Sequence, residues 1–239
     1  MAAAETKKKE VIITGVPEVD EKLGGGIPVG SLCLIEGDSD AGKSVLCQHL
    51  TQGTLISGDA SVAYYTTENN VRSLISQMDS LSLHVLDHFL ADHLRIYPLT
   101  FHGTLQGGNK PFYVLTHHFS RLPDNFSLII VDSITLLVSH SNPVSIIDFF
   151  SRCKGLCDAG RTIILVAHSY AFEEDMLSRT RSLCDARFRL RLEQVGDRMI
   201  KLMEVLKVRG ADRPTGDVVS FDIEPKVGMR IIPLAKARV

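Results

Sequence analysis

The eight residues "GDSDAGKS", from Gly37 to Ser44, fit the pattern G-x-x-x-x-G-K-[ST]. Glycines at Gly37 and Gly42 permit backbone angles that other residues resist, so successive N–H groups can point inward at phosphate oxygens. Lys43 would place a positive charge at the β- and γ-phosphates, and the Ser44 hydroxyl would bind magnesium. An apolar run precedes the motif and a helical pattern follows it, which disfavours the alternative of a glycine turn without a chemical role. We therefore predict a phosphate loop that binds a nucleotide through Gly37, Asp38, Ser39, Asp40, Ala41, Gly42, Lys43 and Ser44.

A second candidate ligand, Asp132, closes the run "SLIIVD". This run is typical of a buried strand, and ligands of open α/β sheets bind at the carboxyl ends of the strands. A carboxylate at that place can hold the water shell of a magnesium ion. The alternative is an ordinary aspartate in a turn, but the phosphate loop upstream favours the metal-binding role. Ser44 and Asp132 are thus the predicted ligands of Mg2+.

The elements that must position these residues follow a βαβ pattern. Near-continuous apolar runs, typical of parallel strands covered on both faces, predict strands at 31–37, 61–67, 94–99, 127–132 and 162–168. Helical patterns between them cover 43–57, 69–80, 110–121 and 143–159. The loop 102–110 is expected to be a mobile surface segment.

After residue 180, polar and apolar residues alternate, which predicts antiparallel hairpins. The first turns at "VGD" between "ARFRLRLEQ" and "RMIKLMEVLKVR", and the second turns between Pro225 and Gly228. The predicted fold is therefore α/β: a mostly parallel central sheet flanked by helices, with a C-terminal antiparallel hairpin region. We expect residues 1–10 to be a flexible tail and 11–239 to be a single nucleotide-binding domain.

The composition excludes some classes of protein. With 44% hydrophobic residues, 23% charged residues and a net charge of −2, we expect neither disorder nor strong non-specific attraction to nucleic acid. No apolar run approaches the roughly 20 residues that cross a bilayer, and the polar start lacks the apolar core of a secretory signal. The odd count of five cysteines favours reduced intracellular thiols. We expect a cytoplasmic protein without direct membrane insertion.

Two further clusters could form part of a metal site. Cys153 and Cys157 lie one helical turn apart, and His84, His88 and His93 follow helical spacing. Neither group has the companion ligands that a zinc site requires. We therefore favour two partly buried thiols and an ordinary helix face over a metal site.

The segment "TGVPEVDEKLGGGIPVGSLCLIEGDSDAGKS" resembles the start of the RecA/KaiC-type P-loop ATPases, and the resemblance continues through "YYTTEN", "LIIVDS", "LVAHS" and "KVRG". It implies a RecA/KaiC-like fold with ATP as the bound nucleotide. In KaiC-like proteins the second strand usually ends in a pair of glutamates, whereas here Glu68 is followed by Asn69. Glu68 is the candidate catalytic base for the attacking water, and Asn69 removes a like charge that would strengthen this base. The substitution predicts weaker or regulated hydrolysis.

Three other residues gain a role from the same resemblance. Lys207 and Arg209 are two apart on a predicted strand and so point to one face. In KaiC-like rings this pair reaches the γ-phosphate of the adjacent subunit, which implies catalytic fingers acting in trans and a homo-oligomeric, hexameric ring. His168, at the end of "TIILVAH", stands where related proteins keep a polar residue that senses the γ-phosphate. A solvated basic strand face and an unremarkable strand-end histidine are the alternatives.

The chain is most similar to one branch of this family, the accessory ATPases of the archaellum (archaeal flagellum) motor. A lone KaiC-like domain, the "EN" pair and the tail "DVVSFDIEPKVGMRIIPLAKARV" carry this likeness. It implies an ATP-binding regulatory and assembly subunit, with slow or absent hydrolysis. Its partners would be the archaellum motor ATPase and membrane-platform or scaffold components at the inner face of the cell membrane.

A RecA/RadA-like DNA-handling ATPase and a KaiC-like autokinase are the alternative functions. DNA binding requires a basic footprint, and Arg187, Arg189 and Arg191 alternate onto one strand face. Acidic residues balance the chain as a whole, so we expect these arginines to form a solvated edge or a protein contact, with no nucleic acid bound. Serines and threonines near the hairpins leave the autokinase open.

Overall fold

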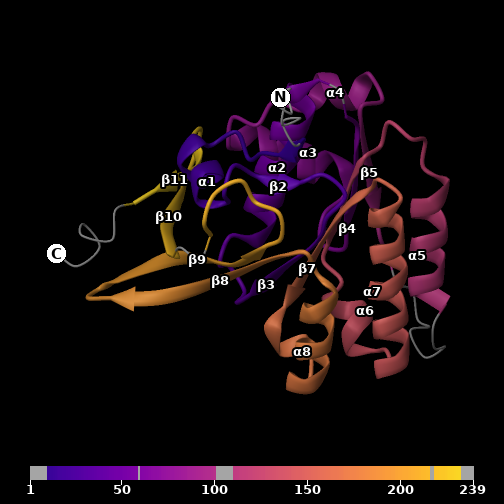
Figure 1. The fold of residues 1–239 in the computed structure, drawn as a ribbon. Coiled ribbons are helices and arrows are strands. Elements are labelled where there is room, and N and C mark those ends of the chain that lie inside the picture. The colour runs from indigo at the N-terminus through magenta and orange to yellow at the C-terminus, as the bar shows by residue number, and fades with distance from the viewer. Residues whose placement is uncertain (1–9, 59, 101–109, 216–217, 233–239) are drawn as a thin grey trace, which may run out of the picture.

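The apolar runs of the sequence form the strands of one large sheet, with helices on both of its faces (Figure 1). The computed structural model describes residues 10–58, 60–100, 110–215 and 218–232. Residues 1–9 of the expected tail and 102–109 of the expected mobile loop lie outside the described residues. The strand order is β11-β10-β9-β8-β3-β7-β6-β4-β5.

The predicted parallel strands are all present. They are β3 (Leu32–Gly37), β4 (Val62–Thr66), β5 (Leu94–Pro98), β6 (Leu128–Asp132) and β7 (Thr162–His168). Parallel pairing brings their carboxyl ends to the same edge of the sheet, so that Gly37 lies opposite His168 and Thr66 opposite Asp132. The candidate ligands therefore meet at one edge.

The C-terminal hairpins extend this sheet. The first comprises β8 (Ala186–Val195) and β9 (Arg198–Val208), and the second β10 (Val218–Glu224) and β11 (Gly228–Ile231). The antiparallel pairing confirms both predicted hairpins. Because β8 also pairs with β3 in parallel, the first hairpin lies directly beside the strand that leads into the phosphate loop. A separate two-stranded sheet joins β1 (Val11–Ile12) to β2 (Ile27–Pro28).

The four predicted helices are confirmed as α2 (Lys43–Ser57), α3 (Val71–Ser80), α5 (Lys110–Arg121) and α7 (Pro143–Asp158). Side chains of Asn70 and Asn142 cap α3 and α7 by accepting hydrogen bonds from Ser73 N and Ser145 N. The sequence patterns missed α1 (Pro17–Lys22), α4 (Leu86–Leu90), α6 (Thr135–Ser139), the 3-10 turn Ser169–Ala171 and α8 (Glu174–Leu183). Within the described residues, no helix combines the length and apolar character needed to cross a bilayer.

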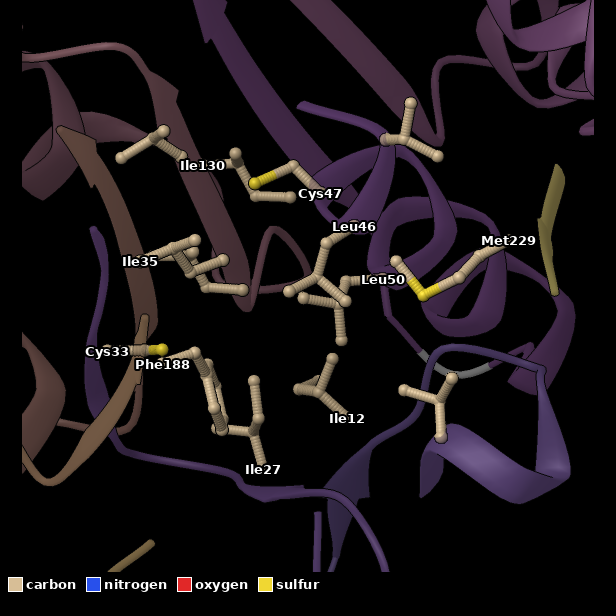
Figure 2. Close-up of a cluster of buried hydrophobic side chains, with 14 of the residues drawn as sticks. Ile12, Ile27, Cys33, Ile35, Leu46, Cys47, Leu50, Ile130, Phe188 and Met229 are labelled. Carbon is tan, nitrogen blue, oxygen red and sulfur yellow. The ribbon is translucent and has the colours of Figure 1, made fainter. Parts of the chain in front are cut away.

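Two hydrophobic clusters cover the two faces of the sheet. On β3, Cys33 and Ile35 face one cluster, while Leu32 and Leu34 face the other. Figure 2 shows part of the first, in which Ile35 lies near Leu46 and Leu50 of α2. Burial on both faces explains why these strands read as continuous apolar runs.

One charged pair is buried at the centre of this sheet. Glu36 of β3 has a side chain only 1% exposed, and Arg181 of α8 donates to both of its carboxylate oxygens at 2.8–3.2 Å. Of the two predicted uses of the β8 arginines, a solvated edge or a protein contact, the edge position is wrong, because β8 lies between β3 and β9 in the interior of the sheet. Arg189 instead faces Glu36 at 3.7 Å, and Arg191 donates to Glu204 at 2.7 Å.

Replacing Arg181 by alanine should remove the guanidinium that donates to Glu36, and Arg189 would stay 3.7 Å away. We expect the free energy of unfolding to fall by about 3 kcal/mol, because an uncompensated buried charge is strongly destabilising. Urea denaturation followed by circular dichroism measures the change. The matched control is Arg179→Ala on the same helix, since Arg179 pairs with the exposed Asp175 and such pairs contribute little. Equal stability of the two variants would contradict the role of the buried pair.

Candidate nucleotide-binding site

The predicted phosphate loop lies between the end of β3 and the start of α2. Gly42 is the N-cap of α2 and has a φ of 93°, in the left-handed region that favours glycine. At Gly37 the φ is 147°, and a Cβ atom there would overlap the backbone oxygen of Leu190 in β8. The motif therefore needs this glycine for close approach of a neighbouring strand as well as for its backbone angle.

Lys43 is buried beneath this loop. Its Nζ donates to the backbone oxygens of Gly37, at 3.3 Å, and of Asp38. Burial lowers the pKa of Lys43, while the nearby carboxylates of Asp132 and Asp38 raise it. The ammonium group thus lies against the backbone of the loop and lines the cleft, where phosphate oxygens would bind.

Asp132, at the end of β6, is buried beside the loop. Its carboxylate accepts hydrogen bonds from the Tyr64 hydroxyl, at 2.7 Å, and from Ser44. Burial raises the pKa of Asp132, and these two hydrogen bonds oppose the rise. Sequence reasoning missed Tyr64; its signal was a tyrosine inside a buried strand, where the hydroxyl needs a partner.

These residues surround a cleft of about 520 Å³. The predicted residues Ser39, Asp40, Gly42, Lys43, Ser44, Glu68, Asp132 and His168 all line it. The further lining residues, which the sequence did not single out, are Val45, Gln77, Ser133, Val166, Tyr170 and Ile223. A cleft of this size at the carboxyl ends of parallel strands fits a nucleotide or a ligand of similar size.

Three predicted loop residues do not line the cleft: Gly37, Asp38 and Ala41. Asp38 instead accepts a hydrogen bond from Leu192 N at 3.2 Å, and Ala41 is buried. The Asp38 side chain therefore ties the loop to β8.

Lys207 and Arg209 lie apart from the cleft of their own chain. Lys207 pairs with Arg187 across the first hairpin, and Arg187 is three residues before Leu190, which faces Gly37. Three strand residues span about 10 Å, so these cations stand toward the opposite end of the sheet. Lys207 Nζ donates to the Cys184 carbonyl, and Arg209 contacts Asp185 at 3.2 Å.

His168 lies at the end of β7, on the wall of the cleft. Its Nδ1 is 3.1 Å from the Thr135 hydroxyl, and the Tyr170 ring stacks on its face with centroids 5.1 Å apart. Burial and then the charge of Lys43 lower the pKa of His168. The ring is therefore positioned by two neighbours, Thr135 and Tyr170, that sequence reasoning did not identify.

Glu68 and Asn69 differ in their surroundings. Glu68 is exposed and lines the cleft. Asn69 is engaged at the start of α3, where its side-chain oxygen accepts from Ser73 Oγ at 2.9 Å and its N–H donates to Thr66 Oγ1 at 3.1 Å. Only Glu68 of this pair has a side chain free to approach a water in the cleft.

The oxygen ligands of this cleft fit a magnesium ion. A hydroxyl from Ser44 and a carboxylate from Asp132 lie together, and Mg2+ prefers one or two such ligands plus water and substrate phosphates. Across the residues that the structure describes, no group of three or more His, Cys, Asp or Glu side chains is arranged to hold a metal alone. The ion would arrive with the nucleotide and neutralise charge on its phosphates.

Comparisons with known proteins agree with this geometry. The family model described as "ATPase: KaiC" matches residues 12–236. The archaeal flagellar ATP-binding protein FlaH of Sulfolobus acidocaldarius is 29% identical over 231 residues, covering 95% of this chain and 99% of that protein. FlaH of Methanocaldococcus jannaschii is 29% identical, covering 90% of this chain and 91% of that protein. These matches confirm the resemblance that the sequence motifs predicted.

Solved structures give the same result. The crystal structure of the flagellar accessory protein FlaH from Methanocaldococcus jannaschii matches with a TM-score of 0.81 at 27% identity, covering 95% of this chain and 100% of that one. A KaiC-like protein from Pyrococcus horikoshii matches with a TM-score of 0.76, 95% of this chain and 100% of that one being covered. At 17% identity the second match shows the fold alone.

Lys43→Ala should weaken the binding of magnesium ATP by at least about tenfold, because it removes a hydrogen-bonding charge from the phosphates. Titration calorimetry measures the affinity, and the thermal stabilisation by ATP should shrink with it. Lys201→Ala is the matched control, since Lys201 lies on β9 outside the cleft. If both variants bind ATP as tightly as the unmutated chain, the site has been misplaced.

Proposed function

Because the chain belongs to the KaiC ATPase family, we propose that it is an ATP-binding regulatory and assembly subunit of the archaellum motor complex. The names of its relatives, archaeal flagellar ATP-binding proteins, support this assignment. In the proposal, ATP-loaded subunits close into a hexameric ring that docks on the motor ATPase and on membrane-platform or scaffold components. The ring works in the cytoplasm at the inner face of the cell membrane, and its hydrolysis is slow or absent.

One observation carries the proposal: the phosphate-binding residues and the cations Lys207 and Arg209 lie toward opposite ends of the sheet in one chain. Lys43, Ser44 and Asp132 gather in the cleft, while Lys207 and Arg209 do not line it. In a head-to-tail ring each subunit receives the cations of the next, so closure completes every site. Charge-assisted contacts to the γ-phosphate are strong and disappear when that phosphate leaves, which would make assembly depend on the nucleotide.

Slow hydrolysis follows from what surrounds the γ-phosphate position. Glu68 is exposed, and the next position along the chain holds Asn69, which bonds to Ser73, in place of a second glutamate. The cations that would stabilise the transition state have to come from another subunit. Because hydrolysis is slow, ATP would stay bound and keep the chain in its assembly-competent state.

The arginines of β8 favour a protein role over nucleic acid binding. Arg189 lies 3.7 Å from Glu36, and Arg191 pairs with Glu193 and Glu204. Their charges are balanced within the chain, whereas a DNA-binding face needs cations available to phosphates.

A pull-down with the purified archaellum motor ATPase tests the proposed function directly. We expect the motor ATPase to retain the chain in magnesium ATP and to lose it in ADP or without nucleotide. Lys43→Ala should abolish the difference, and Lys201→Ala should preserve it. A parallel binding assay with labelled single- and double-stranded DNA tests the alternative, a DNA-handling ATPase. Binding to DNA without binding to the motor ATPase would overturn the assignment.

Arg209→Ala should prevent ATP-dependent ring assembly while leaving the ATP affinity of the isolated subunit nearly unchanged. The fold should survive, because Asp185 keeps a second partner, Lys154, at 2.8 Å. Mass photometry at matched concentrations with ATP or ADP measures assembly. Arg213→Ala is the control, since Arg213 lies four residues further along the chain and only approaches Glu21, at 4.0 Å. Normal assembly of the Arg209→Ala chain would rule out fingers in trans.

A further inference from the structure

Thr135, the first residue of α6, lies at the centre of a hydrogen-bond network behind the cleft. Its hydroxyl accepts from Ser133 Oγ at 3.1 Å and from the backbone N–H of His168 at 3.0 Å. The same hydroxyl is 3.1 Å from His168 Nδ1. Two residues on neighbouring strand ends are thus joined through one oxygen.

The hydrogen-bonding capacity of a threonine decides the protonation of the histidine. A hydroxyl has one proton to donate and two lone pairs to accept with. Ser133 and the His168 N–H use both lone pairs, so the remaining proton of Thr135 points to Nδ1. An Nδ1 that accepts this proton carries none of its own. The neutral ring then has its proton on Nε2, at the edge turned away from Thr135.

We propose that Thr135 is a positioning residue that fixes His168 as the Nε2–H tautomer, and thereby makes the ring a hydrogen-bond donor to the γ-phosphate. The inference rests on the proposed binding of ATP. With the Nδ1 edge held by Thr135, the Nε2 edge is left for the cleft that His168 lines. The opposite tautomer would present a lone pair to phosphate oxygens and repel them.

Two neighbours support the neutral ring in this orientation. Tyr170 stacks on the ring at an interplanar angle of 23°, which restrains its rotation. Lys43 places a positive charge close enough to disfavour an imidazolium. A doubly protonated ring would also turn an Nδ1–H toward a Thr135 oxygen whose lone pairs are already used.

The network continues to the other strand ends of the cleft. Ser133 N donates to Thr67 Oγ1 at 3.1 Å, and Thr67 N donates to the backbone oxygen of Asp132 at 2.9 Å. Thr67 directly precedes Glu68. The hydroxyls of Thr67, Ser133 and Thr135 therefore connect the ends of β4, β6 and β7. Within this network, His168 lines the cleft.

The tautomer can be measured without any nucleotide. Long-range 15N–1H correlation spectra of the full chain report which ring nitrogen is protonated, and His168→Gln assigns the signal. We expect a protonated Nε2 and a bare Nδ1 in the unmutated chain and in Thr135→Ser, and a mixture in Thr135→Val. A protonated Nδ1 in the unmutated chain, or an unchanged tautomer in Thr135→Val, would overturn the inference.

The ratio of ATP to ADP affinity gives the functional readout. We expect Thr135→Val to reduce it in proportion to the fraction of rings that leave the Nε2–H form, about twofold for an even mixture, and Thr135→Ser to retain it. The control is Thr116→Val, because the Thr116 hydroxyl bonds only to carbonyls of its own helix, α5. An unchanged ratio in Thr135→Val would overturn the inference. A chain that binds neither nucleotide would contradict the proposed function instead, and the tautomer spectra would still decide the role of Thr135.

Discussion

The close contact between Gly37 and Leu190 is the constraint on which the site depends. The backbone of β8 approaches so closely that no side chain fits at Gly37, and Asp38 N donates to Leu190 O at 3.0 Å. This contact ties the phosphate loop to the first C-terminal hairpin. Because the hairpin continues to Lys207, one pair of strands fixes both the loop and the cations that face away from it. The spacing between the phosphate loop and these cations is therefore fixed by the sheet.

The second hairpin holds the same region from another side. The Phe221 ring lies against Gly42, and Ile223 lines the cleft. On β11, Met229 N donates at 2.9 Å to Nε2 of His49, a buried histidine of α2 whose pKa burial lowers. The helix whose N-terminus would face the phosphates is thus packed against the last strands of the sheet. Strands distant in sequence from the motif set the shape of its pocket.

Sequence patterns predicted what depends on local periodicity and short motifs. The five parallel strands, the main helices and both hairpins follow from apolar spacing, and most residues predicted for the cleft do line it. Features that depend on distant partners were out of reach. Arg189 of β8 was predicted to lie in a solvated edge or a protein contact, because its partner Glu36 is about 150 residues away along the chain. Helix α8 has few apolar residues, and Thr135 gains its role only when β7 brings His168 beside it.

The contact between Arg209 and Asp185 has a consequence for how a ring would open and close. In the isolated chain the guanidinium already holds a carboxylate, while 61% of the Arg209 side chain stays exposed. Engaging a neighbour's phosphate would then be a ligand exchange, in which one anion replaces another. Asp185 would not be stranded, because Lys154 and the N–H of Leu32 keep hold of it. Arg209 would thus have an anionic partner both with and without the phosphate, and Asp185 would keep a cationic partner in both cases, so neither end state contains an unpaired charge.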